Sequence, residues 1–326
     1  MTTASQSNEK PGGAAGRESV TAQAQPGRPN LFIVGAAKCG TTSLHAYLAQ
    51  HPQICMSSNK EPHYFGSDLN IDPQWRPRDE QHYLSLYQHK PDTPIIGEAS
   101  TWYLYSEKAA QEIKAFNPDA RIIIMLRQPA DFINSLHLQL INGANEDMLD
   151  INQALAAEPD RARNLRIPET CRFKDALQYR RAARFSEQVG RYLEIFGRDR
   201  VGIWLLEDMA QDTGKLLQEV FAFLGVNPDV TIDATRENTT RSLTRFDLYL
   251  KNMFYRSTAF RRLVLKTPKP ILNLYRRTTT KLMPTIRDKG FDPELRARLT
   301  AEYEAEIDSL ALLINRDLEH WKQPNA

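Results

Sequence analysis

One stretch of the chain reads Leu31-Phe32-Ile33-Val34-Gly35-Ala36-Ala37-Lys38-Cys39-Gly40-Thr41-Thr42-Ser43-Leu44. Its first four residues are all apolar, which predicts a strand buried on both faces in a parallel sheet. Leu44 and Leu48 share one face of the helix that follows. Glycine lets the connecting loop fold tightly, so backbone N–H groups and the positive end of the helix dipole meet at one point. The stretch therefore predicts an anion-binding loop in an α/β protein.

The position of the lysine distinguishes this loop from the nucleotide triphosphate loop G-x-x-x-x-G-K-[ST], in which lysine directly follows the second glycine. Gly35 and Gly40 keep that spacing, but Thr41 takes the lysine position and Lys38 lies inside the loop. Because the cation has moved, the group that it neutralises is expected to have moved as well. The residues predicted to contact the ligand here are Gly35, Ala36, Ala37, Lys38, Cys39, Gly40, Thr41, Thr42 and Ser43.

A second segment, residues 59–65, combines a lysine, a carboxylate and an imidazole with two aromatic residues. If this segment is extended, Glu61 and His63 share a face, so two groups able to take a proton point the same way. A polar loop with an aromatic anchor is the plainer interpretation of the same residues.

A third segment begins with residues 121–126, the strongest buried strand in the sequence. Arg127 follows this strand, where open α/β sheets bind ligands. Ser135 lies about one to two turns into the next predicted helix, within reach of a group that Arg127 holds. The alternative is that Arg127 is solvated or paired with Asp131.

Together the three segments resemble the sulfotransferases that use 3′-phosphoadenosine 5′-phosphosulfate (PAPS), in particular the glycan type. The first matches G-x-x-K-x-G-T-T-x-L, the second Lys-Glu-x-His-[Phe/Tyr]-Phe, and the third Arg-x-Pro-x-x-x-x-x-Ser. The resemblance extends from about residue 30 to residue 321. One departure is Ala99, since glycan-type relatives usually carry a lysine there.

The resemblance implies an α/β, P-loop-like three-layer fold with a central parallel sheet flanked by helices. It implies transfer of a sulfuryl group from PAPS, without a metal, to a glycan, glycolipid or small-molecule acceptor. Lys38 and its loop would hold the 5′-phosphosulfate, while Arg127 and Ser135 would hold the 3′-phosphate, with Arg241 as a second contact. Glu61 would be the general base, with His63 as the alternative base or its orienting partner.

Two other functions stay open at this stage. A P-loop kinase or NTPase would need a lysine after Gly40 and an acidic strand end for magnesium, where Thr41 and Arg127 stand. A non-catalytic nucleotide- or glycan-binding module would not require Glu61 and His63 beside the anion loop.

The composition sets limits on the rest of the chain. The chain has 326 residues, a net charge of +2 and a pI near 8.3. This nearly balanced charge does not produce an overall positive field that would favour binding of nucleic acid. Three scattered cysteines are expected to be free thiols, and no apolar run has the length of a signal or membrane span, so we predict a cytoplasmic location. Residues 1–28 are expected to be a disordered tail before a single domain at 29–326.

The segment 251–289 carries eleven lysines and arginines against one acid, interleaved with apolar residues. Such a basic amphipathic segment suits peripheral contact with an anionic membrane at its inner face, or a negatively charged acceptor. Equally, its apolar face would pack on the core while the cations stay in water.

Helices are expected at 106–116, 173–196, 212–224 and 291–314, and a long polar connection at 143–172.

Overall fold

The computed structural model describes residues 27–77, 79–87, 93–234, 253 and 291–323. Nearly all of the predicted tail, Arg241 and all but one residue of the basic segment 251–289 lie outside this range. Within the described part of the chain, none of the helices has the length and apolar character needed to span a bilayer.

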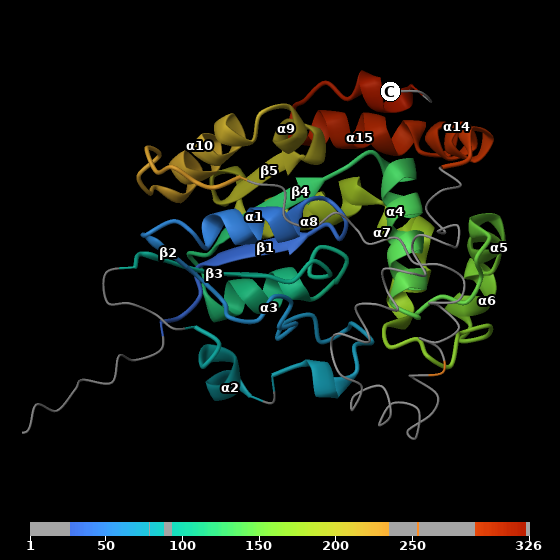
Figure 1. The fold of residues 1–326 in the computed structure, drawn as a ribbon, viewed down its shortest axis with the longest axis horizontal. Helices are drawn as coiled ribbons and strands as arrows, with labels where there is room; N and C mark the ends of the chain where they lie inside the picture. The colour runs from blue at the N-terminus through green and yellow to red at the C-terminus, as the bar shows by residue number, and fades with distance from the viewer. Residues whose placement is uncertain (1–26, 78, 88–92, 235–252, 254–290, 324–326) are drawn as a thin grey trace, which may run out of the picture.

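A parallel sheet forms the centre of the fold, as predicted (Figure 1). Within the described residues it has five strands in the order β2-β3-β1-β4-β5, and each neighbouring pair runs parallel. All carboxyl ends therefore lie along one edge of the sheet. The strands are β1 (Leu31–Gly35), β2 (Ile54–Met56), β3 (Ile95–Ala99), β4 (Arg121–Leu126) and β5 (Val201–Leu205).

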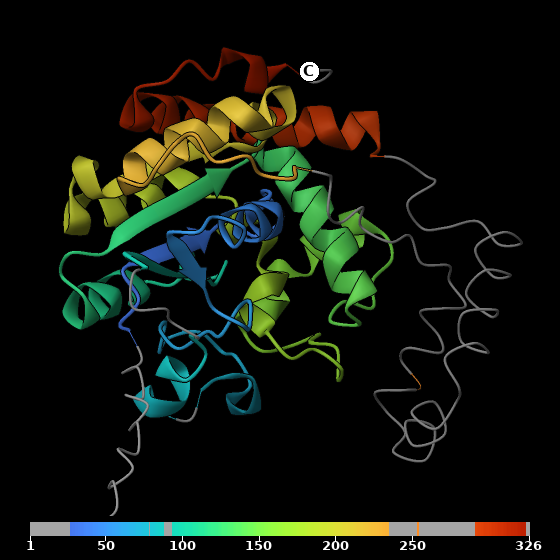
Figure 2. The same ribbon diagram turned by 60° about the vertical axis from the view of Figure 1, so that its left-hand side comes forward.

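Helices cover both faces of this sheet, which gives the three layers (Figures 1 and 2). On one face α1 packs against β1, β2 and β3, and on the other α8 packs against β4 and β5 and contacts α3. The α-helices are α1 (Thr41–Leu48), α2 (Glu80–Leu84), α3 (Ala109–Phe116), α4 (Pro129–Asn142), α5 (Ile151–Ala156), α6 (Glu158–Ala162), α7 (Tyr179–Ala182), α8 (Phe185–Phe196), α9 (Leu206–Gln211), α10 (Thr213–Leu224), α14 (Pro293–Glu302) and α15 (Glu304–Ile314). Short 3-10 turns are η1 (Pro73–Trp75), η2 (Lys174–Leu177), η3 (Arg198–Arg200) and η5 (Glu319–Lys322).

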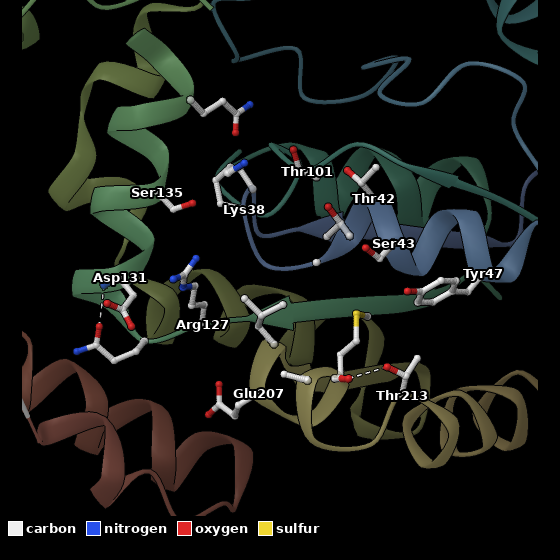
Figure 3. Close-up of a pocket in the computed structure, with 18 of the residues that line it drawn as sticks. Lys38, Thr42, Ser43, Tyr47, Thr101, Arg127, Asp131, Ser135, Glu207 and Thr213 are labelled. Atoms are coloured by element: carbon white, nitrogen blue, oxygen red, sulfur yellow. Dashed lines mark hydrogen bonds between the residues drawn. The ribbon is translucent and has the colours of Figure 1, made fainter. Parts of the chain in front are cut away.

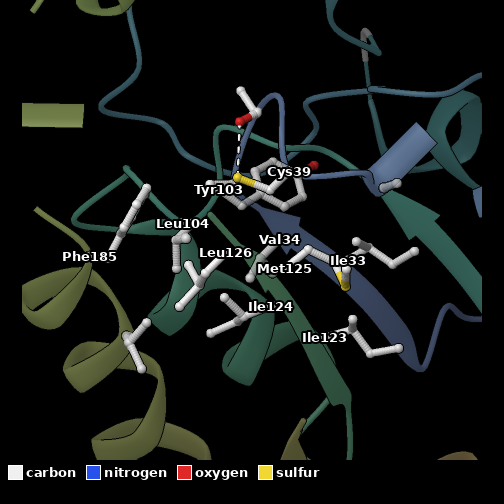
Figure 4. Close-up of a cluster of buried hydrophobic side chains, with 14 of the residues drawn as sticks. Ile33, Val34, Cys39, Tyr103, Leu104, Ile123, Ile124, Met125, Leu126 and Phe185 are labelled. Carbon is white, nitrogen blue, oxygen red and sulfur yellow. Dashed lines mark hydrogen bonds between the residues drawn. The ribbon is translucent and has the colours of Figure 1, made fainter. Parts of the chain in front are cut away.

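The core lies between β1 and β4 and the helices that cover them (Figure 4). Val34, Ile123, Ile124 and Leu126 are all 0% exposed. Full burial of each such side chain is worth about 1.5–3 kcal/mol. This explains why the two apolar runs form the middle of the sheet.

Two predicted helices are interrupted. The segment 173–196 divides into η2, α7 and α8, because Gln178 and Arg184 have non-helical backbone angles. The break lets Arg180 pair with Glu158 and Glu302, which are distant in the sequence. Likewise, the final helix divides at Tyr303 into α14 and α15.

The predicted polar connection 143–172 is also wrong in part, because it contains α5, α6 and a buried ion pair. Arg161 Nη2 lies 2.7 Å from Glu146 Oε1, and both side chains are fully buried. When a carboxylate and a guanidinium are buried together, the charge of each offsets the cost of removing the other from water. This connection is therefore part of the packed structure.

The last described elements pack beside the end of β4. Helix α14 contacts α4, and α15 contacts α8. Gln128 Nε2 donates to Thr300 Oγ1 at 3.1 Å and to the Trp321 carbonyl at 3.2 Å. These bonds place the C-terminal helices next to Gln128, two residues after the end of β4.

Candidate active site

A cavity of about 830 Å³ opens at the carboxyl edge of the sheet. It is bounded by the loop before α1, by α4, by α9 and by the C-terminal helices (Figure 3). Nine of the residues predicted from the sequence line it: Ala37, Lys38, Gly40, Thr41, Thr42, Ser43, Glu61, Arg127 and Ser135. Segments far apart in the sequence are thus brought together at one place.

The loop between β1 and α1 presents backbone to this cavity. Gly40 precedes the helix with φ 84°, and no side chain caps the first turn of α1. Lys38 also has a left-handed backbone, with φ 63°. A helix N-terminus that lacks a side-chain cap has N–H groups available to an anion.

Gly35, Ala36 and Cys39 are not among the residues that line the cavity. Ala36 N donates to the Met125 carbonyl at 2.7 Å, which ties the loop to β4. The Cys39 thiol donates to the Ala37 carbonyl at 3.4 Å and lies in the core (Figure 4). Burial raises the pKa of this thiol to about 12. The Ala36 backbone and the Cys39 side chain therefore support the loop on the side away from the cavity.

Two cations converge on the cavity. Figure 3 shows Lys38, Arg127 and Ser135 turned toward the same space between the loop and α4. Burial, and then the charge of Arg127, lower the pKa of Lys38 below its ordinary value. Among the described residues, no carboxylate lies within 4.0 Å of either cation. Two positive charges held together in this way favour a bound anion between them.

The alternative partner for Arg127 is engaged elsewhere. Asp131 accepts from Arg296, with Nε–Oδ1 3.1 Å and Nη2–Oδ2 3.3 Å. The alternative, an Arg127–Asp131 pair, is not found among the ion pairs of the described residues. Instead, Arg127 stays at the strand end facing the cavity.

Glu61 lies at the cavity wall within a set of polar contacts. Its Oε1 is 2.8 Å from Lys60 Nζ and accepts from Thr101 Oγ1 at 3.1 Å. Its Oε2 is 3.6 Å from His63 Nε2. Burial alone would raise the pKa of Glu61, but hydrogen bonding to His63 and the charge of Lys60 lower it below its ordinary value. The carboxylate is therefore ionised at neutral pH.

His63 stands behind Glu61 rather than on the cavity wall. Its side chain is 11% exposed, and its Nδ1 is buried without a partner among the described residues. Glu61 and His63 have backbone φ angles of 63° and 51°, a region that residues other than glycine rarely adopt. Such backbone costs about 1–3 kcal/mol for each residue and persists only where its surroundings impose it.

Several lining residues were not predicted from the sequence. Lys60 begins the second motif but was given no role. The rule that ligands bind at strand ends would have indicated Thr101, two residues after β3. Glu207, His320 and Trp321 form a further wall, in which His320 Nε2 and Trp321 Nε1 lie 2.9 and 2.6 Å from Glu207 Oε1. No local pattern joins these three, because their contact depends on the tertiary fold.

Comparison with known proteins agrees with this geometry. A family model described as "Sulfotransferase domain" matches residues 28–258. The chain belongs to the sulfotransferase family. This sulfotransferase is similar to the crystal structure of a sulfotransferase from Alicyclobacillus acidocaldarius, with 30% identity, a TM-score of 0.68, and 91% of this chain and 100% of that chain covered. The P-loop-like three-layer fold implied by the motifs is confirmed.

Curated relatives of this sulfotransferase have glycan-related names. Human carbohydrate sulfotransferase 15 is 28% identical over 250 residues, covering 61% of this chain and 44% of that protein. The bifunctional heparan sulfate N-deacetylase/N-sulfotransferase 1 of Caenorhabditis briggsae is 26% identical over 202 residues, covering 60% of this chain and 22% of that protein. The sulfotransferase thus spans less than half the length of either relative.

Proposed function

We propose that the protein transfers the sulfuryl group of PAPS to a hydroxyl or amine of an acceptor. The observation that carries this proposal is the convergence of Lys38, Arg127 and Glu61 on one cavity. PAPS has anionic groups at two separate positions, and the cavity offers cations from two separate strand ends. An ionised carboxylate on the same cavity supplies a group that can take a proton.

Each end of the donor has its own candidate residues. Lys38, the backbone of 36–41 and the hydroxyls of Thr41 and Thr42 would hold the 5′-phosphosulfate. Arg127 and Ser135 would hold the 3′-phosphate, for which the arginine fork is geometrically suited. Arg241, outside the described residues, is proposed as a second contact to that phosphate.

The reaction forms one bond to sulfur and breaks another. The acceptor oxygen or nitrogen attacks the sulfur, and the bond from sulfur to the bridging oxygen of the 5′-phosphate breaks. Negative charge grows on that bridging oxygen, where Lys38 and the loop N–H groups stabilise it. The proton of the acceptor passes to Glu61, and His63 is the alternative base.

The contacts of Glu61 suggest how the donor prepares this base. A carboxylate with a lowered pKa is a weak base, and base catalysis works best when the pKa lies near the working pH. Lys60 lines the same cavity as Lys38. An anionic donor draws the Lys60 ammonium away from Glu61, which raises the pKa of the carboxyl toward the working range.

For the acceptor we propose a glycan, with a glycolipid or small molecule as the alternatives. The carbohydrate and heparan sulfate sulfotransferases among the relatives support this choice. A cytoplasmic location, and a peripheral membrane contact through 251–289, stay predictions. Flotation with neutral and anionic vesicles tests the membrane contact, and equal recovery with both would refute it.

We also propose that residues 29–326 form one domain. The packing of α14 on α4 and of α15 on α8 supports this, because elements after residue 291 complete the core of the earlier ones.

The proposal is tested first by donor binding. Calorimetry with adenosine 3′,5′-bisphosphate (PAP) should show tight binding without metal, and ATP with magnesium should bind weakly. The reverse result would favour a P-loop kinase or NTPase. Transfer of labelled sulfate from PAPS to a panel of glycans and alcohols then separates an enzyme from a binding module, since a module transfers none.

Glu61→Gln tests the base. Loss of general-base help should lower turnover by about 10²–10⁴-fold. The affinity for PAP, measured by calorimetry, should stay within a factor of two. Glu80→Gln is the control, because Glu80 is an exposed carboxylate paired with Arg28 and does not line the cavity. Full activity of Glu61→Gln would reassign the base to His63.

A further inference from the structure

The segment 61–65 is held by the residues at and beyond the end of β3. Glu61 N donates to the Ala99 carbonyl at 2.9 Å. His63 N donates to Ser100 Oγ at 3.1 Å, and Phe65 N donates to the Tyr103 hydroxyl at 3.2 Å. Two of these three acceptors are side-chain hydroxyls, so the course of the segment depends on how those hydroxyls are oriented.

Both hydroxyls lead to the same carboxylate. Ser100 Oγ is 2.6 Å from Glu98 Oε2, and the Tyr103 hydroxyl is 3.2 Å from Glu98 Oε1. Because a backbone N–H can only donate, each hydroxyl accepts from the segment and has its own proton free to donate to Glu98. The Tyr83 hydroxyl donates to Oε1 as well, at 2.6 Å. Glu98 is 0% exposed.

We propose that Glu98 is a positioning residue, whose buried carboxylate holds the segment 61–65, and with it His63, in place through the hydroxyls of Ser100 and Tyr103. This inference rests on the proposed function of Glu61 and His63. The left-handed backbone at both residues needs such support, since neither residue prefers it. A carboxylate suits this position because it accepts hydrogen bonds at both oxygens and donates none.

The charge of Glu98 is part of this arrangement. Burial raises its pKa to about 7, against the opposing effect of the hydrogen bonds from Ser100, Tyr83 and Tyr103. Among the described residues, the titratable groups that face it are tyrosines: Tyr83 on α2, Tyr87 just after α2, Tyr103 after β3, and Tyr192 on α8. When Glu98 takes a proton, one oxygen becomes a donor, and one hydroxyl then loses its acceptor.

Glu98→Gln tests the proposal at nearly constant volume. The amide presents N–H groups to one of the hydroxyls. One of the two arms of the network, the hydrogen bonds from Ser100 and Tyr103 to residue 98, is therefore broken. The carbon-13 histidine spectrum reports the result, with His63→Gln identifying the His63 signal. We expect the ring carbon signals of His63 to shift at constant pH, while the Kd for PAP stays within twofold. With labelled PAPS and an acceptor, kcat should fall at least about tenfold with the donor KM nearly unchanged.

Ser100→Ala and Tyr103→Phe each remove one arm, and both should move the His63 signal in the same direction. They also decide the question if Glu98→Gln does not fold. Tyr179→Phe is the matched control, because the Tyr179 hydroxyl donates at 2.7 Å to the buried carboxylate of Glu146, and neither residue lines the cavity. It should leave the His63 signal unchanged.

The outcomes separate this inference from the proposed function. An unchanged His63 signal in Glu98→Gln, Ser100→Ala and Tyr103→Phe would overturn the role of Glu98, and so would an equal change in Tyr179→Phe. Failure of the wild-type protein to bind PAP would refute the proposed function alone. The His63 comparison would still show whether Glu98 controls the position of that segment.

Discussion

At the scale of single residues, the most informative feature of the cavity is a pair of cations, Lys38 and Arg127, that have no carboxylate partner among the described residues. Lys38 and Arg127 approach each other closely enough for Arg127 to lower the pKa of Lys38. By contrast, all three arginines on α7 and α8 have a carboxylate or carbonyl partner: Arg180, Arg181 and Arg191. The arginine at the end of β4 is therefore available to a ligand.

Arg127→Ala should raise the Kd for PAP by about 10- to 100-fold, because a charge-assisted hydrogen bond contributes about 1.5–3 kcal/mol. Turnover at saturating donor should change much less. Arg121→Ala is the control, since Arg121 begins the same strand at the opposite edge of the sheet. Calorimetry measures both variants, and equal weakening in the two would contradict a specific phosphate contact.

The residues that the sequence predicted are those for which the signal is local. Lys38, Glu61, Arg127 and Ser135 each belong to a short motif at a strand end, and the parallel sheet brings these ends together. The sequence did not predict that the Cys39 side chain faces the core, because loop residues have no periodic pattern that shows which side chains are buried.

At the scale of elements, the turn out of β1 is the tightest point near the cavity. Gly35 has φ 157°, and a Cβ there would lie 2.7 Å from Leu104 Cβ and 2.8 Å from the Thr101 carbonyl oxygen. A backbone oxygen cannot rotate away as a side-chain end can. The anion loop and the residues after β3 are therefore packed as one unit.

Gly35→Ala should destabilise the protein by more than Gly197→Ala. Gly197 also has a positive φ, 77°, but a Cβ there would meet nothing within 4 Å. Gly197→Ala should cost about 1–3 kcal/mol, because φ 77° with ψ 159° is a backbone conformation almost confined to glycine, and Gly35→Ala should add the cost of displacing the backbone. Urea denaturation measures both, and equal losses of stability would show that the close approach at Gly35 is not a constraint.

The helices show why element boundaries were harder to predict than strands. The strand 121–126 was predicted with its observed limits, because an unbroken apolar run has one interpretation. The segment 173–196 has continuous helical periodicity, yet it breaks twice. The breaks let Arg180 pair with Glu158 and Glu302, and a local pattern contains no information about either partner.

At the scale of the whole molecule, buried histidine makes stability depend on pH. Burial lowers the pKa of His45 to about 4, and its Nε2 has no partner among the described residues. The unfolded chain, with a histidine pKa of about 6.5, binds a proton first as the pH falls. The contribution of neutral His45 is therefore complete above about pH 6.5 and is lost as the pH falls toward about 4.

His45→Gln should flatten this part of the stability curve. The wild-type slope from His45 is at most about 1.4 kcal/mol for each pH unit. His82→Gln is the control, because His82 is exposed on α2. Urea denaturation between pH 4 and 7 measures the three proteins, and parallel curves for wild type and His45→Gln would rule out His45 as the source.

The wall that Arg296, His320 and Trp321 add to the cavity comes from residues that are synthesised after all three motifs. While translation is in progress, the β1 loop and Arg127 have left the ribosome, but this wall is still missing. The cavity is thus complete only after α14 and α15 have packed on α4 and α8. A nascent chain, although it already carries all three motifs, has no complete chamber in which to begin turnover.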